Sequence, residues 1–135
     1  RFSFKELMPD PAIVAQKGFT DYPRVAIMEQ INNRIELLLD KNHTLGHAYF
    51  IKDDFVHSFT NEIIPLLQEY FYNDAGKLGL ILGKGFVRAK ALTSATNPNI
   101  FADFDTKNEI DIVKSYELIP FDAIDFKTAI ATLLA

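Results

Sequence analysis

The sequence predicts a mainly α-helical domain with a small appended β portion, an α+β arrangement. Two observations support this class. Up to residue 83, apolar residues recur at three- and four-residue spacings, as they do on one face of a helix. After Gly85 this period gives way to short strand-like runs separated by a polar loop. With 135 residues, 48% of them hydrophobic and 24% charged, the chain has the size of one domain with one core. We divide this single domain, 1–135, into segments 1–20, 21–83 and 84–135.

The N-terminal segment is expected to hold a short strand and then a short helix. Phe2 and Phe4 alternate with polar residues, which is the period of a strand over 1–7. Asp10 is placed to cap a helix that has Pro11 at its first position. Gly18 is expected to end that helix, because glycine is common directly after helices.

The clearest amphipathic helix is predicted over Pro23–Asp40. Glu29, Asn33 and Glu36 fall on one side of it. The apolar stripe on the other side consists of Val25, Met28, Ile31, Ile35 and Leu38. A polar loop is expected to follow over Lys41–Gly46.

A second helical region is predicted over Asp53–Tyr72. Its apolar positions are Phe55, Phe59, Ile63, Leu66, Leu67 and Tyr70. Pro65 lies inside this region, and proline lacks the backbone donor that a helix interior needs. We therefore expect a kink at Pro65, or two helices that meet there. The two helical regions are expected to form the core, with Val25, Met28, Ile31 and Leu38 packed against Ile63, Leu66 and Leu67.

The last third of the chain is expected to hold shorter helices and strands. Asn73 or Asp74 is placed to cap a third helix that Gly83 or Gly85 closes, although the run Leu78–Leu82 also fits a strand. The elements expected after it are a strand over Phe86–Leu92, an irregular loop over 93–105, a strand-like run from Ile110 to Pro120, and a final helix over Phe126–Leu134 capped by Asp125.

Composition excludes several functional classes. The net charge of −4 argues against a main DNA-binding surface, since phosphate contacts need clustered Lys and Arg. No apolar run approaches the length of a membrane span, and the chain does not open on a cleavable apolar leader. The absence of cysteine excludes a disulfide framework. We expect a cytoplasmic protein that does not contact a membrane.

Local motifs for chemistry are weak. The run Gly79–Gly85 has three residues before its Gly-Lys pair, where a phosphate-binding loop has four, and no Ser or Thr follows for magnesium. We expect it to be a helix end closed by glycine. His43 and His47 are four residues apart, but the polar loop around them argues against a shared helical face and a metal site. The aromatic run Tyr70–Tyr72 is expected to pack in the core and not to stack on bases.

Two segments in order carry a family resemblance. His43-Thr-Leu-Gly-His-Ala-Tyr-Phe50 and Asn61-Glu-Ile-Ile-Pro-Leu-Leu-Gln-Glu-Tyr-Phe-Tyr72 resemble the McrB family, the AAA+ GTPase subunit of methylcytosine-specific restriction systems. In that family these segments lie in the helical lid after the nucleotide-hydrolysing core. The resemblance implies a helical AAA+ lid-like bundle over 21–83 and a connector from the core over 1–20. Because no phosphate-binding loop is present, the chain is expected to be the C-terminal lid and tail of a larger enzyme.

The resemblance also implies a site and partners. Gly46 and His47 would face the nucleotide, and Gly46 would allow close backbone approach through a turn with positive φ. Arg1 would be an arginine that reaches a neighbouring subunit's nucleotide. The parent protein would bind GTP or ATP with magnesium, assemble with copies of itself in a ring and drive a nuclease subunit, with DNA bound through other domains or that partner. The chain alone is expected to bind no cofactor and to hydrolyse nothing.

Two other functions remain open from the residues alone. One is a helical protein-interaction module without a nucleotide role. The other is a small metal-dependent hydrolase that would use His43 and His47.

Overall fold

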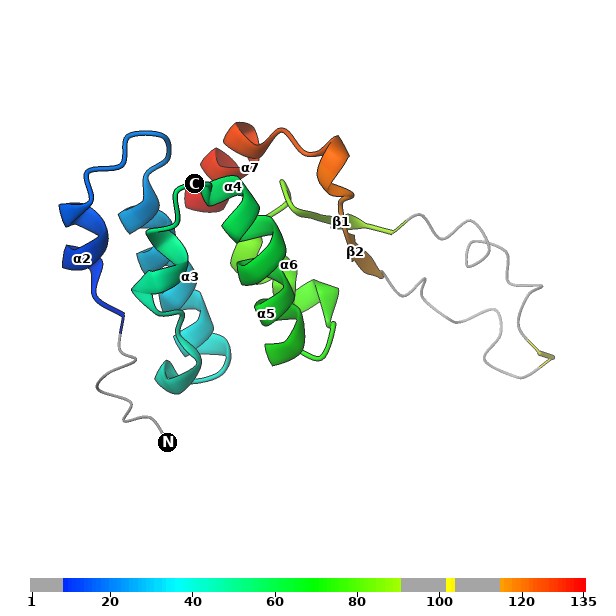
Figure 1. Cartoon of the computed structure of the whole chain (residues 1–135). Coiled ribbons are helices and arrows are strands. Elements are labelled where there is room, and N and C mark those ends of the chain that lie inside the picture. Colours follow the sequence, from blue (N-terminus) through cyan, green and yellow to red (C-terminus); the bar gives the residue numbers. More distant parts are fainter. Residues whose placement is uncertain (1–8, 91–101, 104–114) are drawn as a thin grey trace.

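The computed structural model describes residues 9–90, 102–103 and 115–135. It is mainly α-helical with one small antiparallel sheet, which confirms the predicted class (Figure 1). The helices and strands are α2 (Pro11–Gln16), α3 (Arg24–Leu38), α4 (Phe55–Ser58), the π-helical turn η3 (Phe59–Ile63), α5 (Ile64–Tyr70), α6 (Ala75–Leu82), β1 (Val87–Ala89), β2 (Tyr116–Leu118) and α7 (Phe126–Leu134). Three 3₁₀ turns, η1 (Lys41–His43), η2 (His47–Phe50) and η5 (Phe121–Ala123), complete the described elements.

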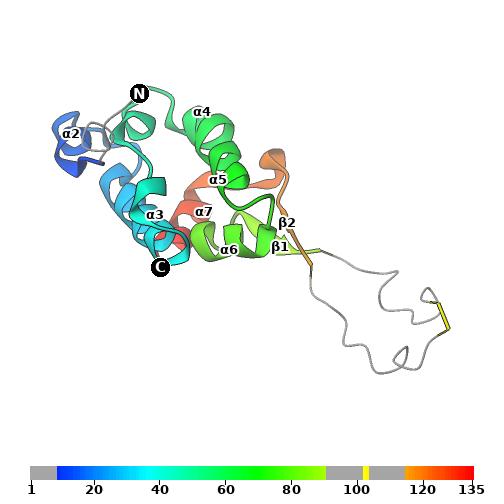
Figure 2. The same cartoon turned by 90° about the horizontal axis from the view of Figure 1, so that it is seen from below.

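Helix α3 is the centre of the arrangement, and it contacts α2, α6 and α7. Helix α2 lies at one end of the described part and the β1–β2 sheet at the other (Figure 1, Figure 2). The predicted core residues Met28, Ile31, Ile63 and Leu67 are buried, whereas Val25, Leu38 and Leu66 are half-buried at the edge of the core. The apolar stripe of α3 is therefore buried by packing against α2, α6 and α7. We attribute most of the stability of α3 to this packing rather than to helix propensity.

Most of the predicted helix ends are confirmed. The carboxylates of Asp10 and Asp74 accept hydrogen bonds from backbone N–H groups in the first turns of α2 and α6. Gly18 and Gly83 follow these two helices with φ of +67° and +85°, a region that glycine enters without steric cost. Asp125 precedes α7 as predicted, but its carboxylate accepts from the Thr128 hydroxyl and caps no backbone N–H.

Where a kink or a junction of two helices was expected, a π-helical turn precedes α5, which begins at Ile64 with Pro65 in its first turn. The chain is continuously helical from Phe55 to Tyr70, and the N–H of Ile64 donates to the carbonyl of Phe59, five residues back. In a regular α-helix the ring of Pro65 would press on the carbonyl of Asn61. The wider π turn just ahead of Pro65 relieves this conflict while the helix continues.

The sheet is smaller than the sequence suggests. Strand β1 pairs with β2 in an antiparallel register in which Val87 lies opposite Leu118, so the predicted run Phe86–Leu92 contributes only three paired residues. The run Leu78–Leu82 belongs to a helix and not to a strand. The predicted strand over 1–7, the start of the run at Ile110 and most of the loop 93–105 lie outside the described residues. No helix in the described part is long and apolar enough to span a membrane.

The end of α5 holds a tyrosine where glycine is usual. The N–H of Asn73 donates to the carbonyl of Gln68 and that of Tyr72 to Glu69, the two hydrogen bonds of a Schellman motif. Tyr72 occupies the left-handed position of this motif with φ of +52°, and 92% of its surface is exposed. The tyrosine side chain therefore contributes little packing, while its backbone conformation is costly for any residue with a Cβ.

We predict that Tyr72→Gly stabilises the protein by about 0.5–1 kcal/mol, because glycine relieves the left-handed strain and little packing is lost. Urea unfolding of both proteins measures the difference. Leu80→Gly is the matched control. It also removes an exposed apolar side chain, but it lies inside α6, where glycine should destabilise by about 1 kcal/mol. A loss of stability in Tyr72→Gly would show that the tyrosine side chain makes a stabilising contact.

Candidate functional site

The segment 45–53 carries the predicted nucleotide-facing residues and connects α3 to α4. Gly46 directly precedes the 3₁₀ turn η2 with φ of −70° and ψ of 160°. This is extended backbone that any residue adopts, so the expected positive φ at Gly46 is wrong. The first half of the predicted polar loop Lys41–Gly46 forms the 3₁₀ turn η1.

A buried asparagine holds the start of this segment. The side-chain amide of Asn32, in the middle of α3, donates to the carbonyl of Leu45 at 3.0 Å. Its Oδ1 accepts from the N–H of Leu45 at 2.6 Å. One side chain thus satisfies both backbone polar groups of a buried residue, in the way a neighbouring strand would.

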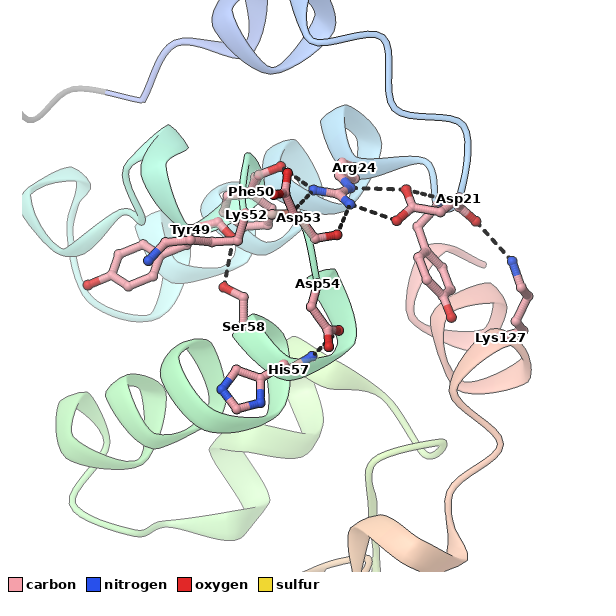
Figure 3. Close-up of polar contacts among 11 residues, drawn as sticks. Asp21, Arg24, Tyr49, Phe50, Lys52, Asp53, Asp54, His57, Ser58 and Lys127 are labelled. Carbon is pink, nitrogen blue, oxygen red and sulfur yellow. Dashed lines mark hydrogen bonds and ion pairs between the residues drawn. The ribbon is translucent and has the colours of Figure 1, made fainter.

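A buried arginine holds the other end of the segment. Arg24, in the first turn of α3, is 2% exposed, and its guanidinium donates to both carboxylate oxygens of Asp21 at 3.1 and 2.6 Å. It also donates to the carbonyls of Phe50, Lys52 and Asp53, at 3.2, 2.6 and 3.5 Å. Figure 3 shows the carboxylate on one side of the guanidinium and the three carbonyls on the other.

Two aromatic rings enclose the same arginine. The guanidinium carbon lies 3.5 Å from the ring centroid of Phe19 and 4.8 Å from that of Phe55. A cation over an aromatic face is attracted by the ring quadrupole, and more strongly when water is excluded. Asp21, the carbonyls and the rings together replace the water that a buried guanidinium loses.

A third contact holds the middle of the segment. The hydroxyl oxygen of Ser58, in α4, lies 3.0 Å from the carbonyl of Tyr49 and 3.0 Å from a carboxylate oxygen of Glu62, and it can donate its one hydrogen to either of them. Figure 3 draws the contact with Tyr49. Leu45 and the carbonyls of residues 50, 52 and 53 are therefore each held by a side chain of α3, and the Tyr49 carbonyl lies within hydrogen-bond distance of Ser58. Gly46, His47 and Ala48 lie between these fixed points, so their backbone is constrained on both sides.

The two predicted histidines have separate surroundings. Nδ1 of His43 lies 2.7 Å from the carboxylate of Asp40, whose pKa this contact lowers, and its ring packs edge-on against Tyr70. Nδ1 of His47 is shielded from water and has no hydrogen-bond partner among the described residues. Across residues 9–90, 102–103 and 115–135, no three His, Asp or Glu side chains come together as a metal site would require.

The other predicted motifs serve the fold where they can be described. Gly83 closes α6 with positive φ, and a Cβ on Gly85 would come within 2.6 Å of the Ala129 Cα, so these two glycines of the run have structural roles. Phe71 is buried as predicted, but Tyr72 is exposed. Arg1 lies outside the described residues. Gly46 and His47 line none of the three described cavities.

The roles of Arg24 and Asn32 were not predicted from the sequence. The signal was present, because Arg24 lies four residues before Met28, and Asn32 lies four residues after Met28, so both continue the apolar stripe of α3. A polar residue in line with such a stripe must find partners when the stripe is buried.

A family model matches the part of the chain that contains Arg24, Asn32 and segment 45–53. Residues 23–79 match the family model described as the McrB alpha-helical lid domain. This region is a McrB-family lid. No curated protein and no solved structure matches the chain significantly. The McrB lid begins one residue before Arg24 and includes Asn32, the whole segment 45–53 and most of α6. The contacts that hold segment 45–53 therefore join residues of the lid, except that Asp21 and Phe19, which contact the Arg24 guanidinium, precede it.

The Asp21–Arg24 pair predicts a pH dependence of the lid's stability. The hydrogen bond from Arg24 lowers the pKa of Asp21 below its ordinary value of 3.8. The pair's contribution should therefore be complete above that pH and be lost as pH falls through the lowered pKa in the folded state. We predict that Asp21→Asn is less stable than the wild type above pH 4 and that the difference shrinks as the pH is lowered toward 2. Urea unfolding across this range measures it, and a constant difference would contradict the assignment.

Proposed function

We propose that the chain is the nucleotide-facing lid of a McrB-like AAA+ NTPase of a modification-dependent DNA restriction system. The lid would close over GTP or ATP held with magnesium by a core elsewhere in the parent protein, and it would help the ring to assemble. The observation that carries this proposal is the fixed segment 45–53 inside a McrB-family lid. A segment ordered before the ligand arrives avoids the entropy cost of ordering it on binding.

Gly46 and His47 would contact the nucleotide. Gly46 has no side chain, so the backbone between Leu45 and His47 can approach a base or ribose closely. Nδ1 of His47 is shielded from water and has no partner in the described part of the chain, so a hydrogen there would be an unsatisfied buried donor. The tautomer with its hydrogen on Nε2 avoids that cost, so Nε2 would be the donor to an acceptor on the nucleotide.

The remaining partners follow from the same proposal. Copies of the parent would form the ring, and Arg1 would reach the nucleotide of a neighbouring subunit. A nuclease subunit would be the partner that the ring drives, with DNA bound through that subunit or through other domains, in the cytoplasm. The acidic net charge of this chain supports placing the DNA elsewhere.

A protein-interaction module without a nucleotide role is the second candidate. Exposed apolar side chains favour it, among them Leu37, Tyr72 and Leu80. A nucleotide-binding lid and an interaction surface are compatible in one domain, so the two candidates differ only in whether His47 contacts nucleotide.

The chain alone should not hydrolyse GTP or ATP. It has no phosphate-binding loop and no hydroxyl beside Lys84 to hold magnesium. The measurement is phosphate release from purified protein with magnesium, against a buffer blank. Release that persists through further purification and scales with protein concentration would contradict the proposed role as a lid.

In the parent protein, His47→Ala should weaken nucleotide binding by roughly two- to twelvefold, the equivalent of one neutral hydrogen bond of about 0.5–1.5 kcal/mol. Thermal stability should not fall by the amount expected for a core residue, because the substitution also removes the unsatisfied Nδ1. His57→Ala, which removes an exposed histidine of α4, is the matched control and should bind nucleotide as the wild type does. Equal affinities for all three proteins would contradict the nucleotide role of His47.

A further inference from the structure

A groove that is separate from segment 45–53 lies between residues 54–61 and residues 121–126. It has a volume of about 550 Å³, and one wall is built by α4 and the π turn η3. The other wall is built by η5 and the start of α7. The lining residues are Asp54, Val56, His57, Thr60, Asn61, Phe121, Asp122, Ile124 and Phe126.

Apolar side chains are exposed to water on both walls. Val56 on one wall is 37% exposed, and Phe121 on the other is 45% exposed. Between them, Phe126 is half-buried and packs edge-on against Phe55, Phe59 and Phe86. The base of the groove is thus anchored in the aromatic core, which gives an apolar ligand a firm surface to pack on.

The charged side chains that line the groove in the described part of the chain have one sign. They are Asp54 and Asp122, and none of the described lining residues is Lys or Arg. Neither carboxylate takes part in an ion pair with another described residue. The ammonium of nearby Lys127 points elsewhere, since it donates to the carbonyl of Asp21 and lies over the ring of Tyr22. The groove therefore favours a cationic ligand and disfavours phosphate groups.

We propose that this groove binds a peptide segment of a partner protein in which apolar side chains alternate with Lys or Arg. The apolar side chains would pack between Val56 and Phe121, and the cations would pair with Asp54 and Asp122 at the rim. Such rim charges act mainly on the association rate and on the choice of partner. The proposal uses none of the residues that are proposed to bind nucleotide, so its test does not depend on the nucleotide role of the lid.

The test uses three fluorescent peptides titrated with the purified chain. The first is Gly-Lys-Leu-Lys-Leu-Lys-Gly, the second has Ser in place of Leu, and the third has Glu in place of Lys. Only the first should bind saturably, and its affinity should fall as salt is raised, because exposed charge pairs are screened. Equal binding of the serine peptide, or preferred binding of the glutamate peptide, would overturn the proposal, as would no binding of the first peptide at millimolar protein.

Substitutions then locate the binding site. Asp122→Lys reverses an exposed charge that makes no hydrogen bond to another described residue, and it should weaken the first peptide's binding roughly three- to tenfold. Phe121→Ser should weaken it by a similar factor with a smaller change in salt dependence. The control Glu36→Lys reverses an exposed charge on α3, outside the groove, and should bind as the wild type does. An equal loss in Glu36→Lys would overturn the location.

Sedimentation of the same variants separates a partner peptide from a second copy of the chain. Asp122→Lys should leave the sedimentation of the free chain unchanged if the groove is open. If it converts a concentration-dependent dimer into a monomer, then the groove is filled by another copy, and the proposed occupant is wrong.

Discussion

The buried guanidinium of Arg24 is the interaction on which the described fold most depends. A charge removed from water is costly unless several dipoles and an opposite charge replace the lost hydration. Here Asp21 and the carbonyls of residues 50, 52 and 53 supply that replacement, and Phe19 and Phe55 close over it. The start of α3, the chain before it and the approach to α4 must therefore meet at one point, because any other arrangement leaves the charge unpaired.

This constraint explains how a segment with little regular secondary structure is ordered. The run 45–53 has a single 3₁₀ turn, and no strand of residues 9–90, 102–103 and 115–135 pairs with its backbone. Arg24 accounts for three of its carbonyls and Asn32 for both polar groups of Leu45. Both side chains belong to α3, which is itself packed against α2, α6 and α7. The position of Gly46 and His47 thus follows from the central helix of the lid.

The sequence was sufficient for features with a local cause. The period of Met28, Ile31 and Ile35 predicts α3, and the capping carboxylate of Asp74 predicts the start of α6, because each signal lies within a few residues of its effect. The McrB resemblance likewise came from two short segments that both lie within the matched region.

Features that depend on contacts across the fold were not predicted. The fork of Arg24 reaches carbonyls more than 25 positions away, and nothing in its own surroundings names them. The π turn arises because Pro65 must remain in a helix whose apolar face is already buried, which local rules for proline do not anticipate. Tyr72 is a local feature that was also missed: the hydrogen bonds at the end of α5 place it in a conformation that propensity assigns to glycine. The nucleotide contact of His47 stays a proposal, since it depends on a ligand that lies outside this chain.

Hydrogen exchange of backbone amides in Arg24→Lys tests the central claim most directly. Lysine keeps the positive charge but lacks the planar fork that reaches Asp21 and the carbonyls together. We expect amides of segment 45–53 to exchange faster than in the wild type, while those of α6 and α7 change little. Arg34→Lys is the control, because Arg34 is the other arginine of α3 that binds a distant carbonyl, that of Ile81 at 2.8 Å, and it should leave 45–53 unchanged. Unchanged exchange across 45–53 in Arg24→Lys, or equal acceleration throughout the chain, would contradict the claim that Arg24 holds this segment in place.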